Sequence, residues 1–381
     1  MHSFGAKLAY FFYSTHLWHT FFFVSAFFLP SVRSILAENA VPLKAKSKNM
    51  MTKKALFILC VIWFGTAARI CGQEGNSVFS FLNLPTSSHA VALGGKNISL
   101  IEDDISLTFQ NPSLLSSVSD RTIGLNFMSY MKGCKTGSAS YAQIVGKYGT
   151  WGVNVMFQGY GKMTETSASG EILGNMKALD MVWSGSYSHA LSERWVGGVS
   201  GKIIYSHLGE FSSCALAVDM GLNYFIEEKD FSLSAVARNL GGQVKAFGDH
   251  HEKLPFDLEV GFTKGLGHAP ISISLTLVDL TRWSNDYFYS TAKKIGKGRI
   301  LTNHFNLGVD IKPASMLYIS AGYNFRRAYE MKAAGSSHAA GLSFGAGVNL
   351  NRIKLGLAYA KYHTGAPTLA LSLAYNFQKK Q

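Results

Sequence analysis

Large apolar residues alternate with small or polar ones along most of the chain after Thr122. The pattern is clearest over 369–377, where every second residue is large and apolar and the residues between are Ala, Ser or Asn. The same period of two recurs over 151–158, 304–311 and 353–360. Side chains of a β-strand point alternately to its two faces, so these segments predict strands with one greasy face and one small, polar face.

About fourteen such segments follow one another, an even number, as in single-chain bacterial outer-membrane barrels. The small, polar faces suit a crowded or water-filled lumen better than a packed soluble core. We therefore predict an all-β fold, a transmembrane outer-membrane β-barrel of about 14 antiparallel strands over 122–377. The predicted strands are 122–131, 136–145, 149–159, 177–189, 194–207, 213–226, 230–240, 256–264, 270–280, 301–311, 315–325, 337–349, 352–361 and 367–377.

Short and long connections alternate between the predicted strands. Bacterial barrels sort their connections in this way, with short periplasmic turns and longer outer loops, whereas a soluble sandwich has no reason to do so. A polar tail, 378–381, follows the last strand. The short connections are 146–148, 191–194, 227–229, 265–269, 312–314 and 350–351. The long ones are 160–176, 241–255, 281–300 and 326–336.

The segment 79–118 precedes the first predicted strand and breaks the alternation. Gly94-Gly95 permits backbone angles closed to other residues, and Asn111-Pro112 signals a turn or a helix start. Two interpretations stay open: a plug or lid packed inside the barrel, or an ordinary N-terminal strand-and-turn extension. We assign 73–121 to a plug or lining segment. Its candidate plug residues are Leu93, Gly94, Gly95, Leu100, Asn111 and Pro112.

Two apolar stretches near the N-terminus offer alternative leaders. The second has Lys53-Lys54, a short apolar core and a polar exit, which is the order of a secretory signal. We expect 1–49 to be a non-native upstream extension, 50–72 to be a signal peptide, and the mature chain to begin near Gln73. The rival interpretation is an N-terminal membrane anchor, because the first apolar stretch, 8–30, is long enough to span a membrane.

Composition fits a barrel and argues against nucleic-acid binding. Charged residues make up only 15% of the chain, against about a quarter in soluble domains. The mean hydropathy of +0.10 is too low for a helical membrane protein. The net charge of +13 lies partly in the leader, because residues 73–381 hold 28 basic and 22 acidic side chains. Such a mild excess, with no recognition motif beside it, predicts no nucleic-acid partner.

Few residues suggest chemistry. Cys134 and Cys214 fall near strand ends on the same side of the sheet, so they are candidates for a disulfide or for two free thiols. The run 249–252 offers metal-ligand side chains, but four neighbours in one loop lack the spacing of a ligand set. Asp103-Asp104 fits a cap or turn better than a carboxylate pair. We predict no catalytic residue, no metal site and no cofactor.

The connection 281–300 combines basic and aromatic side chains. Trp, Tyr and Arg are over-represented among binding hot spots, so this outer loop is a candidate surface for a protein partner or for anionic lipopolysaccharide. The competing interpretation is a solvated loop whose aromatic side chains rest on the barrel rim. The candidate binding residues are Arg282, Trp283, Tyr287, Phe288, Tyr289, Lys293, Lys294, Lys297 and Arg299.

Several short motifs carry a family resemblance. They are Phe81-Leu82-Asn83-Leu84-Pro85, Ala92-Leu93-Gly94-Gly95, Phe109-Gln110-Asn111-Pro112 and His268-Ala269-Pro270. Together they resemble the PorQ-type components of the type IX secretion system, within the outer-membrane barrels related to long-chain fatty-acid transporters. The similarity covers roughly the whole mature chain.

The resemblance implies a non-catalytic barrel in the outer membrane of a Gram-negative bacterium. Such a barrel anchors a cell-surface attachment complex for secreted cargo. Its implied partners are outer-membrane lipid, a sortase, a cargo-shuttling barrel and a surface anchor protein, with lipopolysaccharide as a further candidate. The alternative is an outer-membrane transporter for hydrophobic molecules, which needs an apolar ligand site between plug and barrel. An outer-membrane hydrolase would need a convergent Ser/His/acid set, and the sequence offers none.

Overall fold

A computed structural model describes residues 78–131, 133–167, 169, 171–290, 294–335, 339–364 and 366–378. The chain divides into two compact units, 1–71 and 72–381, and the described residues all belong to the second. The predicted extension 1–49 and signal peptide 50–72 lie outside the described residues and stay predictions, as does most of the tail 378–381.

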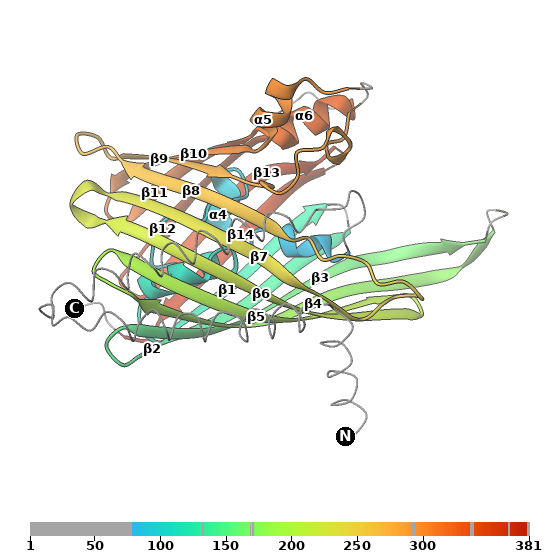
Figure 1. Cartoon of the computed structure of the whole chain (residues 1–381), viewed down its shortest axis with the longest axis horizontal. Coiled ribbons are helices and arrows are strands. Elements are labelled where there is room, and N and C mark those ends of the chain that lie inside the picture. The colour runs from blue at the N-terminus through green and yellow to red at the C-terminus, as the bar shows by residue number, and fades with distance from the viewer. Residues whose placement is uncertain are drawn as a thin grey trace, which may run out of the picture. The chain divides into compact units, whose positions relative to one another are not determined.

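Fourteen antiparallel strands form a closed barrel in which each strand pairs with its neighbours in sequence and β1 closes on β14 (Figure 1). The closing seam runs in register from Thr122 opposite Asn376 to Ser129 opposite Leu369. The predicted all-β barrel is thus confirmed. The strands are β1 Thr122–Met131, β2 Cys134–Val145, β3 Gly149–Thr166, β4 Ile172–Ala190, β5 Trp195–Leu208, β6 Phe211–Ile226, β7 Phe231–Lys245, β8 Asp257–Gly265, β9 Ile271–Leu277, β10 Phe305–Ala314, β11 Leu317–Asn324, β12 Leu342–Asn349, β13 Ile353–His363 and β14 Ala366–Asn376.

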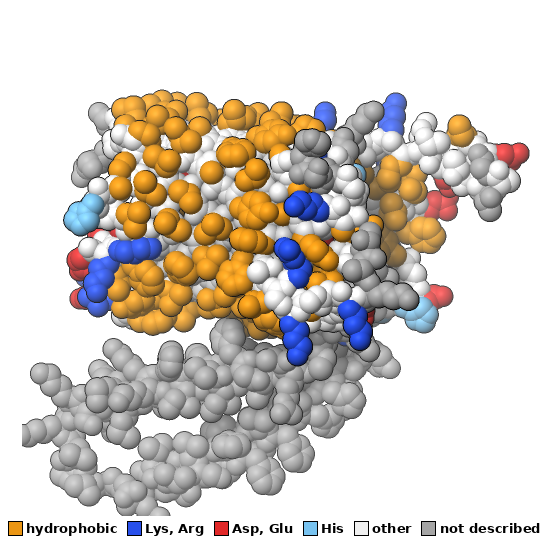
Figure 2. All heavy atoms as spheres, turned by 90° about the horizontal axis from the view of Figure 1, so that it is seen from above, with side chains coloured by type: hydrophobic (Ala, Val, Ile, Leu, Met, Phe, Trp, Pro, Cys, Tyr) orange, Lys and Arg blue, Asp and Glu red, His pale blue; other side chains and the backbone are white. Residues whose placement is uncertain are grey.

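The alternation seen in the sequence separates the outside of the barrel from its lumen. On β14, Leu369, Leu371 and Leu373 are exposed, whereas Ala370 and Ala374 are buried. Repeated around the barrel, this produces the belt of hydrophobic side chains that covers much of the wall in Figure 2. Such a belt suits a wall surrounded by lipid. Among the described residues, no helix is both long and apolar enough to cross a bilayer.

The predicted loop 160–176 is wrong, because β3 and β4 continue through it. Beyond Gly159 and Leu179 the two strands pair with each other as a ribbon that projects past the barrel wall (Figure 1). The side chains on both faces of this ribbon are exposed or half-buried, so its sequence lacks the alternation that marks the other strands. The β1–β2, β5–β6 and β13–β14 connections at the same end of the barrel are short turns.

Two outer connections contain helices. The predicted strand start at 301–304 is wrong, because α5, Lys297–Asn303, occupies it and β10 begins only at Phe305. The β11–β12 connection holds α6, Phe325–Ala333, whose first turn is capped by the Asn324 side chain. We call the end of the barrel that carries the β7–β8, β9–β10 and β11–β12 connections the outer end, in keeping with the predicted orientation.

The segment before β1 folds inside the barrel, which settles the choice between plug and extension in favour of a plug. The plug contains the 3-10 helices η1 Ser80–Asn83, η2 Ile105–Phe109 and η3 Pro112–Ser117, and the α-helix α4 Ser88–Ala92. These elements lie against different parts of the wall: α4 contacts β11–β14, η2 contacts β1 and β2, and η3 contacts β3–β6.

Candidate functional site in the plugged lumen

Glycines on the lumen face allow the backbone of the plug to touch the wall. A Cβ on Gly198 of β5 would overlap the Ser113 nitrogen, and one on Gly322 of β11 would overlap the Gly94 nitrogen. These two strands lie on nearly opposite sides of the barrel. The plug is therefore fitted to the wall on both sides rather than loosely enclosed.

Three ion pairs join the plug to three different strands. Lys96 Nζ lies 2.5 Å from Glu259 Oε1 on β8, His89 Nε2 lies 2.8 Å from Asp310 Oδ1 on β10, and Lys354 Nζ on β13 lies 2.6 Å from Asp103 Oδ2. Buried charges are costly unless they are paired, and breaking one such pair leaves an uncompensated charge. These contacts hold the plug in one position.

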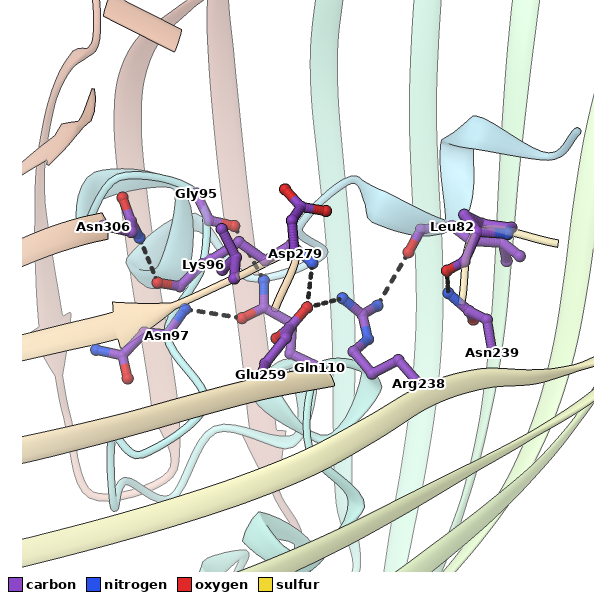
Figure 3. A network of polar contacts seen from close by, with 12 residues as sticks. Leu82, Gly95, Lys96, Asn97, Gln110, Arg238, Asn239, Glu259, Asp279 and Asn306 are labelled. Atoms are coloured by element: carbon purple, nitrogen blue, oxygen red, sulfur yellow. Dashed lines mark hydrogen bonds and ion pairs between the residues drawn. The ribbon is translucent and has the colours of Figure 1, made fainter. Parts of the chain in front are cut away.

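The pair formed by Lys96 also reaches the first residues of the plug. Glu259 Oε1 accepts a second bond from Arg238 Nη1 at 3.2 Å, and Arg238 Nη2 donates to the Leu82 carbonyl oxygen at 2.9 Å. Figure 3 shows this chain of contacts running from Lys96 through Glu259 and Arg238 to Leu82. One charged network thus joins two distant parts of the plug through β7 and β8.

His89 lies between two carboxylates. Its Nδ1 is 2.6 Å from Glu102 Oε2, opposite the bond to Asp310, and its ring stacks on Tyr318 with centroids 4.0 Å apart. Burial alone would lower the pKa of His89, but the two carboxylates outweigh it and raise this pKa to about 10. Burial would raise the pKa of Glu102, yet His89 lowers it to about 2. The site holds an imidazolium between carboxylates at neutral pH.

The otherwise polar lumen wall carries an apolar band. Met156, Val182, Ile204 and Ala215 are directly paired neighbours across β3–β6, and all four are buried. A second row crosses the seam from β1 through β14 to β13. That row is Met128, Ala370 and Ala358. We call these two rows the apolar wall band.

The start of the plug covers the apolar wall band. Phe79, Phe81, Leu82 and Leu84 belong to the same buried cluster as the two rows. The Val78 N–H donates to the Lys253 carbonyl in the β7–β8 connection at 3.2 Å, so this segment begins at the outer end. The segment 79–84 and the apolar wall band therefore pack together as one buried apolar cluster.

The structure places all six candidate plug residues in the lumen. Leu93 and Leu100 are buried in one apolar cluster, and Gly94 and Gly95 form a turn with φ of 95° and 97°. The Asn111 side chain caps η3 by accepting a bond from Ser113 N, and Pro112 begins that helix. Whether these residues serve transport or docking stays a prediction. The charged partners His89, Lys96 and Glu102 were not predicted, because no local pattern in the sequence marks them.

The candidate binding loop divides into an inner and an outer set. Phe288 is buried, and Tyr287 donates to Asp279 Oδ1 at 2.8 Å, so these two side chains hold the loop together. Trp283 and Tyr289 are 50% and 57% exposed. The charged side chains Lys294, Lys297 and Arg299 are exposed as well, Arg282 is half-buried, and Lys293 lies outside the described residues.

Arg326 of α6 fixes this loop to its neighbour. Its guanidinium lies 2.7 Å from Asp279 and 2.9 Å from Glu330, and it packs over the Tyr287 ring 4.3 Å from the centroid. These contacts therefore hold the loop that carries the aromatic side chains in one position. Binding by this loop stays a prediction.

Two smaller predictions are resolved. Cys134 and Cys214 are free thiols rather than a disulfide. Asp104 caps η2 by accepting a bond from Ser106 N at 2.9 Å, and Asp103 accepts one from Ser119 N at 2.6 Å, so the Asp103-Asp104 pair has the predicted capping and turn roles.

Comparison with known proteins finds similarity of fold only. No protein-family model matches the chain, and no curated protein matches it. The Pseudomonas putida toluene transporter TodX is similar with a TM-score of 0.50 and 11% identity, over 80% of this chain and 98% of TodX. A deltaS2 mutant of TodX, a monoaromatic hydrocarbon channel, gives 0.52 and 11%, over 78% and 100%. A Pseudomonas aeruginosa FadL homologue gives 0.47 and 10%, over 77% and 98%.

The two TodX structures share the barrel architecture with this chain. The resemblance to type IX secretion components receives no support from them and stays a prediction.

Proposed function

We propose that this chain is an outer-membrane channel that admits hydrophobic molecules. The apolar wall band carries the proposal. Water in the lumen would gain no favourable free energy from contact with a row of apolar side chains such as Met156, Val182 and Ile204, whereas an apolar solute would gain it by burying its surface against them. The fold shared with the TodX structures supports this choice over the type IX reading.

In this proposal the segment 79–84 occupies the site of the solute. Phe79 and Phe81 are buried in the cluster that includes the apolar wall band. Removing one such side chain from its apolar surroundings costs about 1.5–3 kcal/mol. The segment buries four such side chains, Phe79, Phe81, Leu82 and Leu84, and a hydrophobic molecule that takes their place recovers part of this burial. The ion-paired remainder of the plug forms the floor of the site.

The test is uptake of naphthalene by cells that display the barrel. Ile204 faces the lumen, and its neighbour Ile203 faces outward with 58% exposure. Ile204→Asn should lower uptake per folded barrel, because it places an amide in the apolar wall band. Ile203→Asn makes the same change on the lipid face and should leave uptake per folded barrel unchanged. Heat-modifiable gel mobility reports the folded fraction of each.

A second pair of variants tests the segment itself. Phe79→Ala and Phe81→Ala weaken its packing without adding charge, so both should raise uptake. Equal uptake by wild type, Ile204→Asn and Phe81→Ala would refute the channel.

The second candidate function is a docking barrel. It is favoured by the exposed aromatic side chains of the connection 281–300, a loop that the contacts of Arg326 hold in place. In the PorQ-like form of this hypothesis, the barrel anchors a sortase, a cargo-shuttling barrel and a surface anchor protein, with lipopolysaccharide as a further ligand. Trp283→Ala and Arg282→Ala should then release the co-purifying sortase, and Lys294→Ala should mainly make its retention more salt-sensitive. Retention by all three variants contradicts docking through this loop.

A further inference from the structure

Arg327, at the outer end of the lumen, is a half-buried cation without a counter-ion among the described residues. Its neighbour Arg326 pairs with Asp279 and Glu330, but no acidic side chain in the described chain comes within ion-pairing distance of Arg327. Its Nη1 atom is buried and makes no hydrogen bond to the described residues. A guanidinium in this condition normally has a partner, because burying an unpaired charge is costly.

Tyr362, near the outer end of β13, adds a second unused donor. The Arg327 guanidinium lies over its ring, 3.7 Å from the centroid, and the Tyr362 Oη atom is buried without a hydrogen-bond partner among the described residues. Both groups converge above Gly95 of the plug: a Cβ there would come within 2.6 Å of Tyr362 Oη and 2.8 Å of Arg327 Nη2. Both donors therefore pack directly against the Gly95 backbone, and a larger residue at this position would displace them.

The start of α6 makes the same place electropositive. Arg327 lies in the first turn of this nine-residue helix, and its own N–H is bonded by Asn324 Oδ1 at 2.8 Å. The helix dipole puts partial positive charge at this end, and Asn324 supplies no negative charge to offset it. Guanidinium, phenol and helix terminus all favour a negatively charged acceptor.

We propose that Arg327 and Tyr362 form an oxyanion-binding site at the outer end of the lumen, which takes a carboxylate or a phosphate group. A guanidinium matches the two oxygens of either group in bidentate fashion, and the phenol donates a third bond. The site goes beyond the proposed channel, because a neutral hydrocarbon offers no acceptor to these donors.

The experiment is calorimetric titration of the purified full barrel in non-ionic detergent with sodium phosphate and, separately, sodium acetate. Arg327→Gln should weaken binding of the preferred anion at least roughly tenfold, the range for hydrogen bonds to charged groups. Tyr362→Phe keeps the ring under the guanidinium and removes only the hydroxyl, so binding should weaken roughly fivefold. Lys332→Gln removes one exposed positive charge from the same helix and should leave binding unchanged.

The stronger of the two anions identifies the group that the site takes. Arg327→Lys should recover part of the affinity lost in Arg327→Gln, and gel mobility verifies that each variant is folded. The proposal is overturned if wild type binds neither anion, or if Lys332→Gln weakens binding as much as Arg327→Gln, which would indicate diffuse charge instead of a site. Neither result bears on naphthalene uptake, so the channel and the oxyanion site fail independently.

Discussion

Some residues of the plug have roles that depend only on adjacent residues, and others have roles that depend on distant partners. Gly94-Gly95 and Asn111-Pro112 were visible in the sequence, because a left-handed turn and a capped helix start depend on adjacent residues. His89 was not, because its partner Asp310 lies 221 residues away. A sequence pattern reports neighbours along the chain, and it carries no information about which strand will lie opposite a buried charge.

The fit of plug to wall predicts different effects of one substitution at two nearby glycines. Gly198→Ala would push a methyl group into the backbone of η3 and should lower the free energy of unfolding by about 1–3 kcal/mol. Gly201→Ala on the same strand meets nothing within 4 Å and should cost far less. Denaturant unfolding in micelles measures both, and equal costs would show that the plug can yield at this point.

His89 predicts how stability depends on pH. Its folded pKa of about 10 exceeds the ordinary 6.5, so its contribution is complete below pH 6.5 and is lost as pH rises through about 10. Glu102 has a folded pKa of about 2, below the ordinary 4.5, so its contribution is complete above pH 4.5 and is lost as pH falls through about 2.

His89→Gln should therefore remove most of the stability loss between pH 6.5 and 10. Unfolding midpoints across this range, with wild type alongside, provide the measurement. A variant that retains the full wild-type slope would assign the alkaline loss to another group.

At the scale of elements, strands facing lipid were predictable and irregular outer parts were not. Alternation located all fourteen strands, because each has two chemically different surroundings. It failed for the ribbon of β3 and β4, whose two faces have similar surroundings, and for α5, which is too short to show a helical period. The plug was recognisable as a break in the pattern, yet its contacts with ten or more strands were not.

The projecting ribbon should be dispensable for the barrel. In the sheet, residues 162–166 pair only with 172–177, whereas β2 stops pairing at Gly159 and β5 at Ala178. One backbone bond to the rest of the chain remains at the base of the ribbon, from the Gly209 N–H to the Lys177 carbonyl oxygen at 3.0 Å. Replacing 162–177 with a two-residue turn should leave the folded yield and the unfolding midpoint nearly unchanged. Ile172 and Leu173, exposed at 74% and 64%, would be lost with it, so the shortened protein should also aggregate less. A collapse in folded yield would mean that the ribbon guides assembly.

At the scale of the whole molecule, the two faces of the wall should respond differently to substitution. Leu371 is 51% exposed on the lipid face, and its neighbour Ala370 is buried on the lumen face. Leu371→Arg places a charge near mid-membrane and should cost roughly 2–4 kcal/mol. Ala370→Ser should cost far less. Folding yield into lipid vesicles compares the two, and similar yields would contradict the assignment of lipid and lumen faces.

The close fit of the plug also constrains the order in which this protein can be assembled. The plug precedes β1 in the chain and contacts strands from β1 to β14, and its backbone lies against glycines on opposite walls. A ring already closed would leave no clearance for a segment of this width to enter and turn. We therefore expect the plug to be seated before the seam between β1 and β14 closes, so that closure of the last strand is the step that traps it.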